Sequence, residues 1–126
     1  MSSRPRMAAL DIRLRRAYEP PAEDDGYRIL IDRIWPRGVT RDELRIDEWA
    51  RELAPSTELR KWYGHEPAKF EEFRRRYTEE LAAHADALER LRARAAAGRL
   101  TIVFGARDIE HSNAAVLARV LRDLAA

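Results

Sequence analysis

The sequence has 126 residues, of which 45% are hydrophobic and 37% are charged, so it is long enough and apolar enough to build one folded domain. Its 24 lysine and arginine residues nearly balance 22 aspartate and glutamate residues, and a net charge of +2 is not the signature of a nucleic-acid-binding protein. The lack of cysteine excludes disulfides, thiolate catalysis, iron–sulfur clusters and thiolate zinc sites.

The N-terminal residues predict neither a membrane anchor nor a secretion leader. Residues 1–8 are typical of a loose tail, and residues 9–126 are predicted to form a single α/β domain. No apolar run approaches the ~20 residues that cross a bilayer, and the first residues lack the hydrophobic stretch that directs secretion. We therefore expect a cytoplasmic protein with no membrane partner.

The next part of the chain predicts two strands joined by a loop. Residues 10–15 alternate apolar and charged side chains, which is typical of a half-buried strand at a sheet edge. Residues 19–26 contain two prolines, a glycine and several acids, and therefore predict a loop. Residues 27–31 are mainly aliphatic and β-branched, which favours a central strand covered on both faces. The pattern alone leaves the relative orientation of the two strands open.

Helices and one further strand are predicted for the rest of the chain. Thr40 and Glu43 have the spacing of a capping box, and the apolar stripe that follows through Leu53 breaks near Ile46 or continues as one helix. Apolar residues at helical spacing then predict helices over residues 57–63, 67–81 and 86–97 and at the C-terminus, with a buried strand over residues 100–105. Strands separated by helices favour a small, mainly parallel sheet of about three to four strands, packed by four to five helices.

The residues best suited to chemistry follow two of the predicted strands. Those after the strand over 27–31 are Asp32, Arg33, Trp35 and Arg37, and those after the strand over 100–105 are Arg107, Asp108, His111 and Asn113. If these strands are neighbours, both sets meet at the carboxyl edge of the sheet, where α/β proteins place their ligands. Guanidinium groups and the open N–H groups of the last helix would bind phosphate or carboxylate there. The sequence therefore predicts a small anionic ligand.

Each candidate residue has a functional and a structural interpretation. Asp32, Asp108 and His111 are candidates for acid–base catalysis, and His65, in a turn between helices, is a fourth. The candidate ligand-binding residues are Arg33, Trp35, Arg37, Arg60, Arg107 and Asn113. Alternatively, the carboxylates form internal salt bridges, Ser112 or Asn113 caps the last helix, His65 is a cap, and Trp35 belongs to the core.

The sequence predicts no cofactor and no metal site. It contains no glycine-rich phosphate loop, no dinucleotide-binding fingerprint, no helical zinc motif and no serine nucleophile elbow. His65, His111, Asp32 and Asp108 carry nitrogen and oxygen donors, but the neighbouring arginines would repel a cation.

Three stretches of sequence resemble the YeaO-like branch of the bacterial domain-of-unknown-function 488 family. They are Asp32–Gly38, which has the sequence DRIWPRG, residues 53–65, which contain LAPS and LRKWYGH, and residues 106–114, which have the sequence ARDIEHSNA. The resemblance covers residues 10–124 and implies a small α/β fold whose motif residues gather at one end of the sheet. The family has no established activity, so the resemblance implies no substrate and no reaction.

The chain departs from the family pattern at two places. Family members have an aromatic residue and two alanines where this chain has Phe104, Gly105 and Ala106, and asparagine where it has Ser112, so the resemblance implies no role for the Ser112 side chain. Longer relatives place a helix between the first two strands. The loop over residues 19–26 replaces that helix here, which favours parallel pairing of these two strands.

Two functions from different classes are consistent with these observations. The first is an enzyme that acts on a phosphorylated or nucleotide-like small molecule in an anion pocket. The second is a non-catalytic binding or regulatory module that senses an anionic metabolite or docks nucleic acid, the nucleic acid being the less favoured partner. Nothing in the sequence predicts the oligomeric state.

Overall fold

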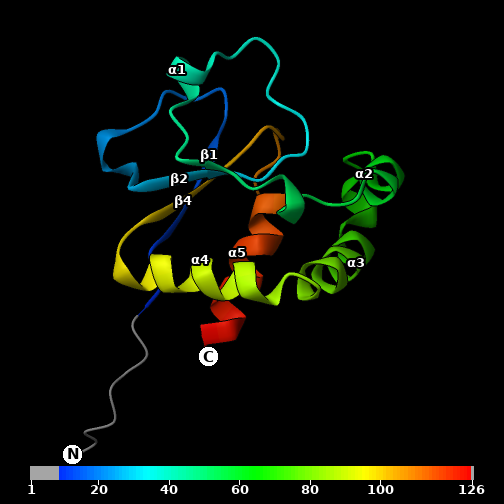
Figure 1. Cartoon of the computed structure of the whole chain (residues 1–126). Coiled ribbons are helices and arrows are strands. Elements are labelled where there is room, and N and C mark those ends of the chain that lie inside the picture. The colour runs from blue at the N-terminus through cyan, green and yellow to red at the C-terminus, as the bar shows by residue number, and fades with distance from the viewer. Residues whose placement is uncertain (1–8, 126) are drawn as a thin grey trace, which may run out of the picture.

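The computed structural model describes residues 9–125, so the predicted tail over residues 1–8 lies outside the described residues. Four parallel strands form one sheet in the described part of the chain (Figure 1). In sheet order they are β1 (Ile12–Arg16), β4 (Leu100–Phe104), β2 (Tyr27–Leu30) and β3 (Glu48–Trp49). The predicted class, a small parallel α/β sheet packed by helices, is confirmed.

The central strand β4 separates the two strands that precede it in the chain. Leu100 lies opposite Ile12 of β1 on one side and opposite Tyr27 of β2 on the other. The first two strands therefore run parallel, but the expectation that they pair with each other is wrong. The reason is that all five residues of β4 are buried, and such a strand gains most from backbone partners on both of its edges.

Five α-helices complete the described chain. They are α1 (Arg41–Leu44), α2 (Thr57–Tyr63), α3 (Phe70–Ala82), α4 (Ala85–Ala97) and α5 (Asn113–Ala125). Figure 1 shows α3, α4 and α5 together on one side of the sheet, where their apolar residues pack with those of the strands in the main hydrophobic core. The opposite face is covered by α1 and by loops, over a smaller cluster formed by Ala17, Leu30, Leu44 and Val103.

Local capping residues set the starts of two helices, and the first of these caps was predicted. Thr40 and Glu43 form the reciprocal capping box of α1, and Ser56 accepts a hydrogen bond from the Leu59 N–H at the start of α2. The segment after α1 differs from the expected helical continuation. Arg45 adopts a left-handed conformation that ends α1, and Glu48 and Trp49 then pair with the open edge of β2 as strand β3.

A buried ion pair anchors the loop that joins β1 to β2. The Asp25 carboxylate, which is 1% exposed, accepts hydrogen bonds from Arg28 at 2.6 Å and from Arg13 at 2.8 Å. The Asp25 carbonyl accepts a further hydrogen bond from the Thr101 hydroxyl of β4. The loop therefore crosses the sheet face in a fixed position.

No helix among the described residues combines the length and the apolar character that a membrane crossing needs.

Candidate functional site

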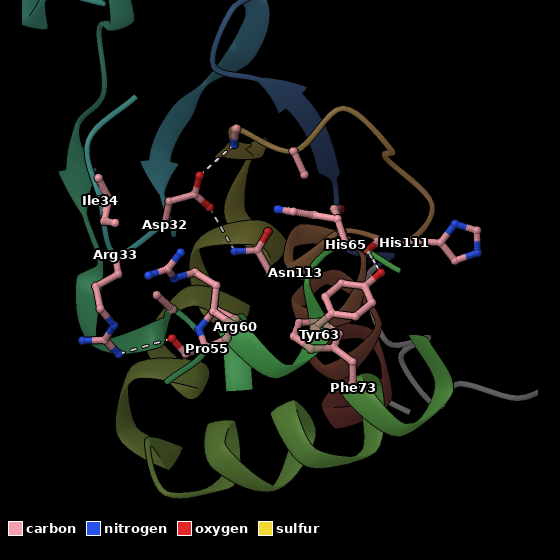
Figure 2. A pocket seen from close by; sticks show the side chains of 14 residues that line it. Asp32, Arg33, Ile34, Pro55, Arg60, Tyr63, His65, Phe73, His111 and Asn113 are labelled. Carbon is pink, nitrogen blue, oxygen red and sulfur yellow. Dashed lines mark hydrogen bonds between the residues drawn. The ribbon is translucent and has the colours of Figure 1, made fainter. Parts of the chain in front are cut away.

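A cavity of about 240 Å³ lies at the carboxyl edge of the sheet, where β2 and β4 end (Figure 2). We call it the sheet-edge cavity, and it is lined by Asp32, Arg33, Ile34, Ala54, Pro55, Arg60, Tyr63, His65, Phe73, Gly105, Ala106, His111, Ser112 and Asn113. These residues come from the ends of β2 and β4, from α2 with its flanking loops, from α3 and from the start of α5. The fold therefore joins segments that lie far apart in the sequence.

Asp32 is the half-buried acid of the cavity. Its Oδ2 atom accepts the Gly105 N–H at 2.8 Å, and its Oδ1 atom accepts the Asn113 side-chain amide at 3.0 Å. Burial raises the pKa of Asp32 above its ordinary value, although both hydrogen bonds and the positive charges of His65 and Arg60 act in the opposite direction.

Ser112 and Asn113 close the N-terminus of α5. The Ala114 N–H donates to the Asn113 side-chain oxygen at 3.0 Å, and the Ala115 N–H donates to the Ser112 hydroxyl oxygen at 3.1 Å. The Val116 N–H donates to the Ser112 carbonyl. Side chains therefore satisfy two of the N–H groups that were expected to be open, and the Ser112 carbonyl accepts a third. Asn113 also links the helix to β2 through Asp32.

Three basic side chains stand at the exposed side of the cavity. Arg33 donates a long hydrogen bond of 3.4 Å to the Pro55 carbonyl, and Arg60 extends from α2 (Figure 2). In the described residues, no carboxylate forms an ion pair with Arg60 or His65. His65 has a positive φ of 57°, which is uncommon outside glycine, and it directly follows Gly64, where α2 ends.

His111 and Asp108 form a separate pair outside the cavity. The His111 Nδ1 atom lies 2.7 Å from Asp108 Oδ2, and this hydrogen bond is the main cause that lowers the pKa of Asp108. The imidazole packs edge-on against Phe70 at 4.9 Å and is directed away from Asp32 (Figure 2). His111 lines the cavity with its backbone, whose carbonyl accepts the Tyr63 hydroxyl at 2.6 Å. Asp32 and His111 do not form one acid–base pair in this arrangement.

The structure brings together some of the candidate residues and leaves others apart. Those that line the cavity are Asp32, Arg33, Arg60, His65, His111 and Asn113. Trp35 packs in a T-shaped contact with Trp49 at 5.2 Å and donates its indole N–H to the Val39 carbonyl. Arg37 and Arg107 are exposed and, like Trp35 and Asp108, do not line the cavity.

The apolar wall of the cavity was missed from the sequence. Tyr63 and Phe73 stack with ring centroids 4.2 Å apart, and both also line the cavity next to Ala54 and Pro55. Both residues lie in helices that were predicted and both are buried, but helical spacing does not show that one side of a core residue faces a cavity. The nearby LAPS motif was the sequence feature that could have indicated this wall.

In the described part of the chain, no three side chains from His, Cys, Asp and Glu lie close enough together to hold a metal ion.

Comparisons with known proteins show what the chain as a whole is similar to. The family model described as "Inactive DUF488-N3 subclade" matches residues 11–126. The chain is 46% identical to an uncharacterized protein of Mycobacterium tuberculosis over 110 residues, which cover 87% of this chain and 92% of that relative. It is 43% identical to the uncharacterized protein YeaO of Escherichia coli over 115 residues, which cover 91% of this chain and 100% of YeaO. No solved structure matches the chain.

Proposed function

The chain belongs to the DUF488-N3i family, the inactive DUF488-N3 subclade, and from this premise we propose that it is a non-catalytic protein that binds a small anionic molecule in the sheet-edge cavity. One observation carries the proposal. Arg33, Arg60 and His65 surround a cavity with apolar walls, and Arg60 has no ion-pair partner among the described residues. A guanidinium group in that position is a ready donor for phosphate or carboxylate.

The pairing of arginines elsewhere supports a small ligand over nucleic acid. On α3, Arg75 pairs with Glu72 at 2.6 Å, and on α4, Arg90 pairs with Glu48 of β3 at 2.7 Å. Such pairs interleave acids with bases, so they do not build the continuous basic face that follows a nucleic-acid backbone. Arg33 and Arg60 at the cavity form no ion pair among the described residues, and the same holds for Arg37 and Arg107 outside it.

The hydrogen bonds around the cavity support a non-catalytic role. The Ser112 hydroxyl donates to the Ile109 carbonyl at 2.7 Å and caps α5, so it is not a free nucleophile. Asp32 accepts hydrogen bonds that tie β4 and α5 to β2, and the His111 imidazole is directed away from it. The Asp32 and Ser112 side chains are therefore engaged in holding the fold together, and the His111 imidazole is paired with Asp108.

Thermal unfolding with added inorganic phosphate tests the proposal. A ligand that binds only the folded state raises Tm in a saturable way, so we expect such a rise with phosphate over a sodium chloride control of equal ionic strength. Arg60→Ala should abolish the rise. Lys61→Ala is the matched control, because Lys61 is the next residue of α2, is exposed and does not line the cavity.

Two results would contradict the proposal. An equal rise in Tm in the parent protein and in the Arg60→Ala variant would place phosphate binding elsewhere. Release of phosphate from para-nitrophenyl phosphate that disappears in an Asp32→Asn variant would contradict the non-catalytic role. Binding to duplex DNA that weakens steeply with salt would favour the nucleic-acid alternative.

A further inference from the structure

We infer that the ligand of the sheet-edge cavity is amphoteric: it places an N–H donor group against the Asp32 carboxylate and an anionic group against Arg60, with a small apolar body between them. This inference rests on the proposed function and narrows it to one class of ligand. It follows from the distribution of charge, exposure and apolar surface within the cavity.

Asp32 has unused capacity to accept hydrogen bonds. A carboxylate accepts up to about four hydrogen bonds, two on each oxygen. Among the described residues, Gly105 donates one to Oδ2 and Asn113 donates one to Oδ1. Each oxygen therefore retains an acceptor position, and Asp32 lines the cavity. A simple anion placed there would be repelled, whereas an amine or another N–H group would be bound.

The basic side chains lie at a different depth from Asp32. Arg33, Arg60 and His65 are exposed, whereas Asp32 is half-buried at the end of β2. Figure 2 shows Asp32 at the end of the sheet and Arg60 reaching toward it from α2. The cavity therefore has an acidic inner end and a basic mouth. A ligand with a donor at one end and an anion at the other satisfies both ends at once.

The walls between the two ends select the body of the ligand. Ala54 and Pro55 line the cavity together with the buried rings of Tyr63 and Phe73, which stack on each other, so the walls are apolar. A volume of about 240 Å³ lies below the usual ~300 to 1,000 Å³ of pockets for drug-sized ligands. The cavity therefore suits a body of about one ring.

Three matched probes separate the two ends of the ligand. Para-(aminomethyl)benzenesulfonate carries both groups, para-ethylbenzenesulfonate replaces the amine by a methyl group of similar size, and benzylamine lacks the sulfonate. Calorimetric titration of the parent protein should give about tenfold tighter binding of the first probe than of either other probe, as expected for one charge-assisted hydrogen bond. The sulfonate stays ionised throughout, so it reports on Arg60 without titrating itself.

Two variants test which residue binds each end of the amphoteric probe. In Asp32→Asn, para-(aminomethyl)benzenesulfonate should bind only about threefold more tightly than para-ethylbenzenesulfonate, or less, because the variant lacks the negative charge at residue 32. In Arg60→Ala, the advantage over benzylamine should fall to a similar extent. Lys61→Ala should preserve both advantages. The comparison in the parent protein needs no variant, so the inference stays testable if Asp32→Asn does not fold.

The outcomes distinguish this inference from the proposed function. If para-ethylbenzenesulfonate binds as tightly as the amphoteric probe, and its binding is lost in Arg60→Ala, the cavity binds anions but the amphoteric ligand is wrong. If neither sulfonate nor inorganic phosphate shows binding that depends on Arg60, the proposed function fails and this inference fails with it. Unequal binding in the predicted direction, lost in the matching variant, supports both.

Discussion

Asp32 and Asp108 follow neighbouring strands, yet their surroundings shift the pKa of each carboxyl group in opposite directions. Burial raises the pKa of Asp32, and the hydrogen bond from His111 lowers the pKa of Asp108. A raised pKa means that the folded state holds the proton more tightly than the unfolded chain. Asp32 therefore adds stability as the pH falls, whereas Asp108 adds stability only while it stays ionised.

We predict opposite pH dependences for the two amide variants. The free energy of unfolding of the parent protein, relative to Asp32→Asn, should rise as the pH falls from about 7 to about 4, because protonation relieves the buried charge. Relative to Asp108→Asn, it should fall only as the pH drops below about 4, where the Asp108 carboxylate becomes protonated. Urea unfolding of the three proteins at several pH values measures both differences.

A further variant isolates the effect of Asp32. Arg60, His65 and Tyr77 are the charged or titratable groups that interact with this carboxylate, and the ordinary titration of a histidine falls within the same range. The comparison is therefore repeated in a His65→Ala background. Parallel slopes for the Asp32 and Asp108 variants would contradict the assigned environments.

The connection from β1 to β2 has little freedom, because it crosses the sheet face close to the backbone of another element. At Gly26, where this connection enters β2, φ is +67°, and an added Cβ atom would lie 2.4 Å from the Arg99 carbonyl oxygen. Both the conformation and the close approach require glycine at this position.

Three glycine-to-alanine variants separate the two constraints. Gly26→Ala should lower the free energy of unfolding by more than ~2 kcal/mol, since it combines an unfavourable φ with a clash. Gly38→Ala, with a φ of +79° and nothing within 4 Å of the added atom, should lose only ~1 kcal/mol. Gly98→Ala, which has extended backbone and open space, should change the free energy by less than ~1 kcal/mol.

Urea unfolding of the three variants checks this order. Equal losses in Gly26→Ala and Gly38→Ala would show that the contact with Arg99 does not constrain the connection.

Patterns of neighbouring residues predicted the helices and strands better than they predicted which strands pair with each other. Helix α2 spans the predicted residues 57–63, and Ser56 and Gly64 bound it, because capping depends on residues next to each other in the chain. Strand β3 was missed, because two residues carry no period and extend only through pairing with β2. The insertion of β4 between β1 and β2 is likewise set by contacts across the chain.

The same distinction applies to the site. Because β2 and β4 are neighbours, the sequence predicted correctly that segments 81 positions apart would meet, as Asp32 and Asn113 do. The sequence could not predict the direction of the His111 side chain. That direction depends on the contact with Phe70 and on the pairing with Asp108, and no periodic pattern reports either.

Over the whole molecule, acidic side chains stabilise the fold mainly as ionised partners of arginine. Burial alone would raise the pKa of Asp25, but hydrogen bonds from the Ala22 N–H, Arg13 and Arg28 hold it below its ordinary value. The pKa of Glu48 is lowered mainly by Arg90, and that of Glu72 falls to about 2 beside Arg75 and Arg76. The stability that these groups contribute is present above their ordinary pKa of about 4 and is lost as the pH falls.

We predict that burial, rather than the size of the pKa shift, decides which acid matters most. Asp25→Asn should cost ~3 to 5 kcal/mol, because it leaves the Arg28 guanidinium buried without its charge partner. Glu72→Gln should cost little, since both partners of Glu72 are exposed and solvent screens the pairs. Urea unfolding at neutral pH measures both. A larger loss in Glu72→Gln would overturn this ranking.

The place of β4 in the sheet has a consequence for how the protein is made. A ribosome delivers β1 and β2 long before Leu100–Phe104, yet neither strand has its central partner until that late segment emerges. Until that segment emerges, Ile29 and Leu30 of β2 can pair only with β3, and the edge of β2 that faces β4 stays open. A chain that is truncated before residue 100 would contain most of the residues but could not form the continuous sheet. We expect such a chain to be bound by chaperones or degraded by proteases.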